Sequence, residues 1–111
     1  MTEEDRKFLE SKQEALRLRI ALKRFFETDS IEWRKRYGAY LKLRIRPAMK
    51  ELITAGAIEK IEQLSAYAGY SEKNLDEFID MAVKQGKAEV TVYLMKEKKE
   101  KFGFIDQDFS L

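Results

Sequence analysis

Basic and aromatic side chains are mixed along residues 16–50, and together they are the residue types that hold nucleic acid. Trp33, Tyr37 and Tyr40 are the aromatic members. The basic members around them are Arg34, Lys35, Arg36, Lys42, Arg44 and Arg46. Lysine and arginine bind phosphate groups, and aromatic rings stack on bases. The stretch therefore predicts nucleic-acid binding as one function of the chain.

A plainer interpretation fits the same stretch. Trp33, Tyr37 and Leu41 fall on one stripe at helical spacing, which favours rings that point into a core and basic side chains that are merely solvated. The isoelectric point of about 8.8 lies below the value of about 9 that marks a dedicated nucleic-acid domain. An acidic protein surface or an anionic membrane would also fit such a face. Nucleic acid is therefore the alternative partner, and a protein is the favoured one.

Acidic side chains gather in the other half of the chain. Residues 12–50 hold twelve Lys and Arg against four Asp and Glu, whereas residues 51–83 hold two against seven. Asp76 and Asp80 are four residues apart, hence on one helix face, where they could suggest a metal site. No loop has calcium-binding spacing, so we expect a solvated acidic face. The two halves could meet each other or an oppositely charged partner.

The sequence lacks two of the residue types most often used in catalysis. The chain contains no cysteine and no histidine, which removes thiol nucleophiles, thiolate metal sites and the usual general base near neutral pH. No glycine-rich phosphate-binding motif is present. We therefore predict a protein that is not an enzyme, with no catalytic, metal-binding or cofactor-binding residues.

Helix-forming residues and apolar residues at three- and four-residue spacing predict about six helices and no strands. The expected ranges are 2–27, 30–45, 47–55, 58–67, 75–84 and 88–101. Asp29, with Glu32 three residues on, is the expected cap of the second helix, and Asn74 with Glu77 that of the fifth.

Glycine and proline mark two further positions. Pro47 suits the first turn of the third helix, and it should push Arg46 toward an extended conformation. Gly38 lies inside the second helix at a cost of about 1 kcal/mol against alanine. We therefore expect either a close backbone contact or a locally loose helix there.

A pair of glycines thirty residues apart organises the C-terminal half. Aligning Gly56 with Gly86 places Leu64 on Leu94. Glycine at a helix end supplies the positive φ of a tight corner. Each unit is then a short helix, a glycine turn and an antiparallel helix, and stacking the units buries faces that neither could bury alone.

The second unit, MAVKQGKAEVTVYLM, resembles the helix pair of an ankyrin repeat. Residues 82–83 match the two small apolar residues before the glycine, 89–90 match the family's Glu-Val, and 94–95 match its closing leucines. The first unit, LITAGAIEKIEQL, matches more loosely. The family's Thr-Pro-Leu-His turn is replaced by NLDE at 74–77. Because the spacing is shorter than about 33 residues, the projecting finger of that family should be absent or reduced.

A longer resemblance covers residues 71–103. The stretch SEKNLDEFIDMAVKQGKAEVTVYLMKEKKEKFG is similar to a helical module of uncharacterised bacterial proteins, which typically carries ITxENLDEFIELAxxxGxTEITAYLLxYKxxxFG. That family has no assigned activity, so the likeness implies a fold and no function.

The chain ends in an apolar tail. Phe102, Phe104, Ile105, Phe109 and Leu111 all lie in its last ten residues. Free termini are normally polar and disordered. We expect the tail either to cap the last hairpin, whose apolar face would otherwise be wet, or to dock on a partner.

These patterns predict one all-α domain. Residues 1–46 form a basic helical pair that acts as a cap, 47–103 form two stacked ankyrin-like units, and 104–111 form the tail. No apolar run is long enough for a membrane span and the first residues, MTEEDRKF, are too acidic for a signal peptide, so we expect a cytoplasmic protein.

The predicted function is a non-enzymatic protein-interaction module, with nucleic-acid binding as the alternative and a homo-oligomer also open. The candidate interaction residues are Arg34, Arg36, Tyr40, Lys42, Arg44, Arg46, Asp76 and Asp80.

Overall fold

Helices account for nearly all of the described chain. The computed structural model describes residues 1–103, and within them seven α-helices and no strand occur. The helices are α1 (Glu3–Glu10), α2 (Glu14–Glu27), α3 (Ile31–Leu43), α4 (Ile45–Ala55), α5 (Ile58–Ala68), α6 (Glu72–Lys84) and α7 (Ala88–Phe102). The predicted all-α class is thus confirmed for these residues. The apolar tail at 104–111 lies outside them.

The predicted first helix is two helices, which accounts for the difference from the expected six. Ser11 and Gln13 have extended backbone conformations, and the Ser11 hydroxyl accepts a hydrogen bond from the Gln13 N–H at 3.0 Å. A serine hydroxyl can replace a helical backbone hydrogen bond in this way, and helix propensity averaged over the segment does not predict such a break. The chain turns there, and α1 packs against α2.

Serines begin two helices where the sequence favoured other residues one to three positions away. The Ser30 hydroxyl accepts from the Trp33 N–H, and the Ser71 hydroxyl accepts from the Asn74 N–H. The predicted caps Asp29 and Asn74 were therefore wrong. Aspartate, asparagine and serine cap about equally well, so the choice between neighbours depends on where the chain enters the helix.

Pro47 separates α3 from α4. Proline has no N–H to donate to the Leu43 carbonyl four residues earlier, and its ring crowds that carbonyl. The helix accordingly ends at Leu43, and Arg44 breaks it with φ −124° and ψ 39°. Arg46 lies inside the first turn of α4, so the prediction that it would be extended was wrong. The break falls two residues earlier than expected.

Glycine corners join α4 to α5 and α6 to α7. Gly56 and Gly86 have φ of 67° and 68°, in the left-handed region that other residues reach only with strain. At each corner the residue after the glycine donates its N–H to a carbonyl five residues earlier, from Ala57 to Leu52 at 3.0 Å and from Lys87 to Ala82 at 2.9 Å. The two hairpins thus turn in the same way thirty residues apart.

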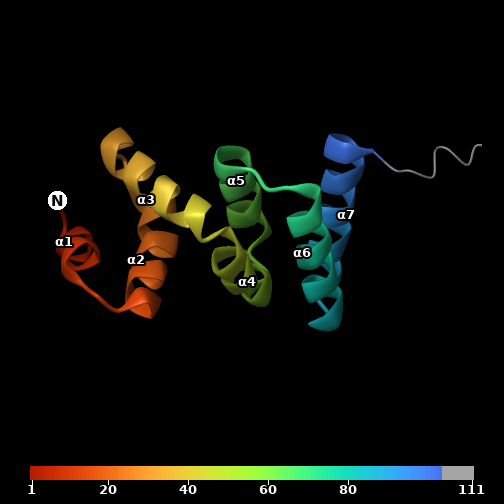
Figure 1. The fold of residues 1–111 in the computed structure, drawn as a ribbon, viewed down its shortest axis with the longest axis horizontal. Helices are drawn as coiled ribbons and strands as arrows, with labels where there is room; N and C mark the ends of the chain where they lie inside the picture. The colour runs from red at the N-terminus through yellow and green to blue at the C-terminus, as the bar shows by residue number, and fades with distance from the viewer. Residues whose placement is uncertain (104–111) are drawn as a thin grey trace, which may run out of the picture.

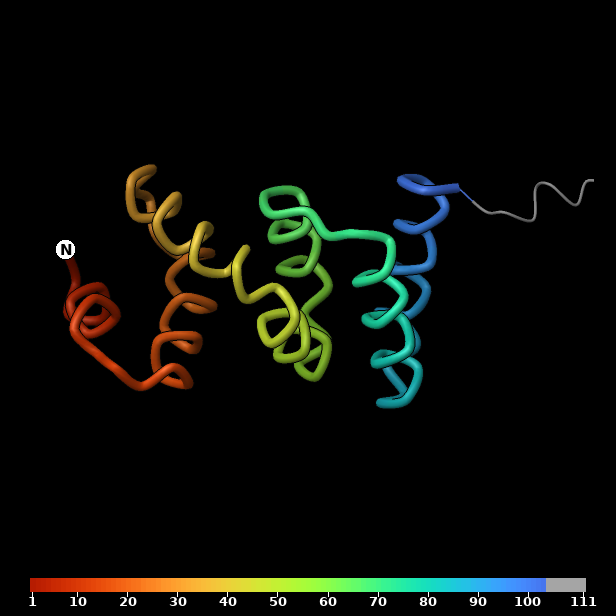
Figure 2. The backbone as a smooth tube through the Cα atoms, viewed as in Figure 1, coloured from red at the N-terminus to blue at the C-terminus, as the bar shows by residue number. Residues whose placement is uncertain are grey.

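The hairpins follow one another along the molecule (Figure 1). Helix α4 contacts α6 and α5 contacts α7, so the hairpin α6–α7 lies against α4–α5. Helices α2 and α3 pair with each other, and α3 contacts both α4 and α5. An extended connection leads from α5 to α6 (Figure 2).

One apolar core runs through this row of helices. Its completely buried large side chains are Phe25, Tyr37, Leu41, Met49, Ile53, Ile61, Leu64, Leu75, Phe78 and Leu94. On the predicted stripe of α3, Tyr37 and Leu41 are buried while Trp33 is partly buried. Phe8 of α1 joins them, with its ring centroid 4.7 Å from that of Tyr37.

Gly38 is a site of close approach. The ring of Tyr67, from α5, lies over it, and a Cβ added at Gly38 would stand 2.3 Å from Tyr67 Cε1. The glycine in mid-helix therefore lets α5 come close to α3. Of the two explanations expected for this glycine, the close backbone contact is the one that the structure contains.

A buried carboxylate fastens α1 to α2 and α3. Asp5, 1% exposed, receives hydrogen bonds from the Thr2 N–H at 3.0 Å, from Arg24 Nε at 3.2 Å and from the Tyr37 hydroxyl. Burial alone would raise the pKa of Asp5, but these donors outweigh it and lower the pKa from 3.8 to about 2. Burial, followed by the hydrogen bond to Asp5, raises the pKa of the Tyr37 hydroxyl.

The Gly38→Ala variant should be destabilised by about 1–3 kcal/mol because its methyl group overlaps the Tyr67 ring. In a Tyr67→Ala background the same change should instead stabilise the protein by about 1 kcal/mol, since alanine is the better helix former. Urea unfolding of the four chains measures both effects. Equal effects in the two backgrounds would show that the close contact is not the reason for the glycine.

Acid should remove the contribution of Asp5. Its pKa is depressed in the folded state, so its stabilisation is complete above the unfolded value of 3.8 and is lost as the pH falls toward 2. The shift corresponds to about 2 kcal/mol of unfolding free energy. Unfolding free energies measured between a pH of about 5 and about 2 should fall less steeply for Asp5→Asn than for wild type. Asp29→Asn, at an exposed loop position, is the control and should follow wild type.

Candidate interaction surface

The aromatic residues of the basic stretch do not form a stacking surface. Tyr37 is completely buried, Tyr40 is 7% exposed, and Trp33 is partly buried. The guanidinium groups of Arg44 and Arg36 lie over the rings of Tyr40 and Trp33, at 4.0 and 4.7 Å from the ring centroids. These contacts occupy the ring faces that a nucleic-acid base would need.

Two of the predicted site residues, Tyr40 and Arg44, meet at one carboxylate. Glu14 Oε1 accepts a hydrogen bond from the Tyr40 hydroxyl at 3.0 Å and from Arg44 Nε at 2.8 Å. These bonds, from Arg44 first and then from Tyr40, lower the pKa of Glu14. Because Glu14 belongs to α2, the cluster ties α2 to the end of α3.

The remaining predicted residues are dispersed over the surface. Arg34 lies over the Phe25 ring at 4.7 Å, and Arg46 pairs with Glu77 at 2.7 Å. Lys42 is exposed and makes no hydrogen bond or ion pair with another described residue. Among the predicted basic residues within 1–103, two therefore lie against a predicted aromatic ring: Arg44 against Tyr40 and Arg36 against Trp33.

The predicted acidic site residues of α6, Asp76 and Asp80, are both paired with lysines. Asp76 lies 2.7 Å from Lys98 Nζ, and Asp80 lies 3.0 Å from Lys84 Nζ. Within residues 1–103, no group of three or more acidic side chains is placed to hold a metal ion. The pair between Arg46 and Glu77 joins the basic half to the acidic half inside one molecule.

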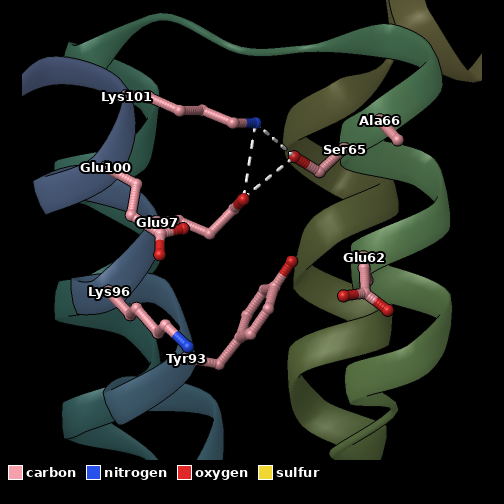
Figure 3. Close-up of a pocket in the computed structure, with 8 residues that line it drawn as sticks. All are labelled: Glu62, Ser65, Ala66, Tyr93, Lys96, Glu97, Glu100 and Lys101. Carbon is pink, nitrogen blue, oxygen red and sulfur yellow. Dashed lines mark hydrogen bonds and ion pairs between the residues drawn. The ribbon is translucent and has the colours of Figure 1, made fainter.

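A groove between α5 and α7 has a volume of about 570 Å³. Its lining comes from two successive hairpins (Figure 3): Glu62, Ser65 and Ala66 from α5, and Tyr93, Lys96, Glu97, Glu100 and Lys101 from α7. A shallower hollow of about 380 Å³ is lined by Ile58, Ala88, Glu89, Val92 and Tyr93. Tyr93 lines both hollows, and we call them together the α5–α7 groove.

A polar cluster centred on Glu97 forms one wall of this groove. Glu97 Oε1 accepts hydrogen bonds from the Tyr70 hydroxyl and from Ser65 Oγ, the latter at 3.0 Å. Lys101 Nζ lies 3.0 Å from Ser65 Oγ and 3.4 Å from Glu97 Oε2 (Figure 3). The cluster connects α5, the connection to α6, and α7.

Local structure places each member of the Glu97 cluster. Glu97 and Lys101 are four residues apart on α7, so they share a face. Gly69, with φ of 70°, ends α5 and directs Tyr70 toward α7, where its ring also contacts Phe78 at 5.5 Å between centroids. Sequence reasoning missed Glu97. A signal was present, because Glu97 follows the buried Val90 and Leu94 at helical spacing and so faces the core.

Burial and acidic neighbours change the proton affinity of the groove tyrosines. Burial and then Glu97 raise the pKa of the Tyr70 hydroxyl. Burial, followed by the charges of Glu97 and Glu62, raises the pKa of Tyr93 to about 12. Both phenols are therefore neutral hydrogen-bond donors at ordinary pH. Ser65 is 3% exposed, and its hydroxyl donates to Glu97 and accepts from Lys101, so it is held in place.

Comparisons with known proteins add no family to this description. No protein-family model matches the chain, and no curated protein or solved structure is significantly similar to it. Along residues 1–103, no helix combines the length and the apolar character needed to cross a membrane.

Glu97→Ala should destabilise the protein by about 1–3 kcal/mol, because it leaves the Ser65 and Tyr70 hydroxyls without their acceptor. Glu100→Ala removes a carboxylate from an exposed position of the same helix and should change stability by less than about 0.5 kcal/mol. Chemical denaturation of both variants makes the comparison. Equal losses would mean that the cluster does not hold α5 and α7 together.

Proposed function

We propose that this protein is a non-enzymatic interaction module that binds a segment of a partner protein in the α5–α7 groove. The observation that carries the proposal is the composition of the groove from equivalent helices of two successive hairpins. The corners at Gly56 and Gly86, thirty residues apart, support an ankyrin-like arrangement of these hairpins. Stacked helical units generally use such shared surfaces for binding.

The groove has an apolar part that could anchor a partner side chain. Ile58 and Tyr93 are partly buried and packed against the core, and Val92 is exposed beside them. Partly buried aromatic and aliphatic side chains at the centre of an interface supply most of its binding energy. An apolar side chain from a partner would be covered on two sides here, by α5 and by α7.

Charged residues of both signs surround this apolar part. Glu62 and Glu100 are exposed at the groove, and Lys96 lies beside them. A polar rim around an apolar centre is the usual organisation of a protein interface. The rim favours a partner segment that carries both acidic and basic side chains over a polyanion, which Glu62, Glu97 and Glu100 would repel.

The contacts of the basic stretch favour a protein partner over nucleic acid. The rings of Tyr37 and Tyr40 are buried, and Arg44 and Arg46 form ion pairs with Glu14 and Glu77. Binding of DNA or RNA would have to compete with these pairs. Such binding would also weaken steeply with salt.

A charge reversal in the groove tests the proposal. Glu62→Lys should weaken partner binding by about tenfold or more, the loss of affinity expected for a residue that contributes strongly to an interface. Glu59→Lys makes the same change at an exposed position of α5 that does not line the groove, and should bind as wild type does. Tyr93→Ala should also weaken binding.

The partner is first captured from a lysate with the wild-type protein and then titrated against the purified variants by calorimetry. Loss of binding in Glu59→Lys to the same degree as in Glu62→Lys would contradict the groove. Salt-sensitive gel shifts of DNA or RNA by the wild-type protein, without a protein partner, would favour the nucleic-acid alternative.

A further inference from the structure

Helix α7 has a second apolar stripe on its exposed side, and the first two members of the stripe, Ala88 and Val92, also border the shallower hollow shared with Ile58. Val92, Met95 and Phe102 are 67%, 47% and 41% exposed. Ala88 is exposed on the same face. Large apolar side chains are normally scattered singly over a protein surface, whereas a contiguous row of them usually marks an interaction site.

The spacing of this stripe is that of a coiled-coil seam. Ala88, Val92, Met95, Lys99 and Phe102 follow one another at intervals of four, three, four and three residues. This is the heptad pattern, with Val92 and Lys99 at a positions and Ala88, Met95 and Phe102 at d positions. A lone amphipathic helix buries one stripe, and α7 already buries Val90 and Leu94 in the core. The second stripe therefore calls for a second helical neighbour.

The equivalent face of the preceding hairpin has such a neighbour. Thirty residues earlier, Ile58, Glu62 and Ser65 occupy the positions of Ala88, Val92 and Met95. On α5 those residues line the hollows that face α7. The outer stripe of α7 is thus the place where the repeat would put another helix, and two of its positions are apolar where α5 has glutamate and serine.

We propose that α7 packs antiparallel against α7 of a second copy of this chain, forming a two-fold symmetric dimer. In antiparallel pairs each a position faces a d position. Val92 then faces Met95 of the second copy, and Lys99 faces Ala88 of the second copy. The small alanine leaves room for the lysine stem to lie along the seam while its ammonium group reaches water.

Charge determines the antiparallel orientation. A parallel pair would place Lys99 against Lys99 of the second copy, and like charges in a seam repel. The antiparallel pair instead places Glu89 opposite Lys96 of the second copy, and by symmetry it does so twice. Glu89 and Lys96 are exposed, and neither forms a hydrogen bond or ion pair with another of residues 1–103. The ion pairs across the seam supply those partners.

Sedimentation velocity over roughly a hundredfold range of protein concentration should show a monomer–dimer equilibrium, since only association depends on concentration. Val92→Asp and Met95→Asp should abolish the dimer. Both positions are exposed, so the monomer should keep its helical circular dichroism. Leu43→Asp, at a position 82% exposed on α3, is the control and should dimerise as wild type does.

Charge-changed variants test the register. Glu89→Lys and Lys96→Glu should each weaken self-association by about tenfold, because every pair across the seam becomes repulsive. An equal mixture of the two variants should recover the dimer as a heterodimer, because both pairs are then attractive. A mixture that stays monomeric, while wild type dimerises, would overturn the proposed register.

Cross-linking tests the orientation, and the chain has no cysteine of its own. A mixture of Ala88→Cys and Lys99→Cys should form a disulfide-linked heterodimer. Lys99→Cys alone should not cross-link; efficient cross-linking of that variant would indicate a parallel pair and overturn the proposal.

Two further outcomes would assign the stripe to another occupant. A wild-type chain that remains monomeric at every concentration overturns the dimer. If a dye specific for apolar surface binds this monomer only after residues 104–111 are removed, the stripe belongs to the chain's own C-terminal segment instead.

Discussion

Each helical hairpin of this chain has more apolar surface than its own two helices can cover. Helix α4 buries Met49 and Ile53, α5 buries Ile61 and Leu64, and these side chains are shielded from water only because helices before and after them lie alongside. Burial of this kind is the largest favourable term in folding. Because each hairpin buries its remaining apolar surface against the next, the hairpins form a row. The two ends of such a row have apolar surface that another segment must cover.

The N-terminal end is closed by groups that differ from those inside the row. Phe8 packs against Tyr37, and the ionised Asp5 is held by Thr2, Arg24 and the Tyr37 hydroxyl. A buried charge is tolerated only where donors surround it. Because Arg24 and Tyr37 belong to α2 and α3, Asp5 has all its donors only when α1 has the correct position. Tail residues 104–111 are not part of the described structure, and at the C-terminal end Val92 and Met95 of α7 remain exposed.

The sequence was sufficient for features that depend on nearby residues. Helical periodicity located the helices to within a few residues, and Gly56 and Gly86 mark corners because the left-handed backbone strongly favours glycine. The break at Ser11 was missed because one side-chain hydrogen bond decided it.

Contacts between distant residues were harder to foresee. The pair between Arg46 and Glu77 spans 31 residues, and no local pattern indicates which carboxylate an arginine will meet. The same is true of Glu14, which binds both Tyr40 and Arg44. Charge asymmetry along the chain therefore predicted a basic surface for a partner, whereas several of the basic groups have acidic neighbours within the molecule.

Helix α7 makes polar contacts toward α5 and carries an apolar stripe on its exposed side. Toward α5 the contact includes Glu97, Ser65 and Lys101, whose hydrogen bonds have fixed lengths and directions. Apolar contact tolerates small shifts between helices, but a buried carboxylate that loses its donors is costly. The Glu97 cluster therefore fixes the register of one hairpin on the next, and the α5–α7 groove lies beside it. On the exposed side of α7 the stripe is mainly apolar but includes Lys99, and the heptad spacing of Val92 and Met95 is the basis of the proposed contact with a second helix.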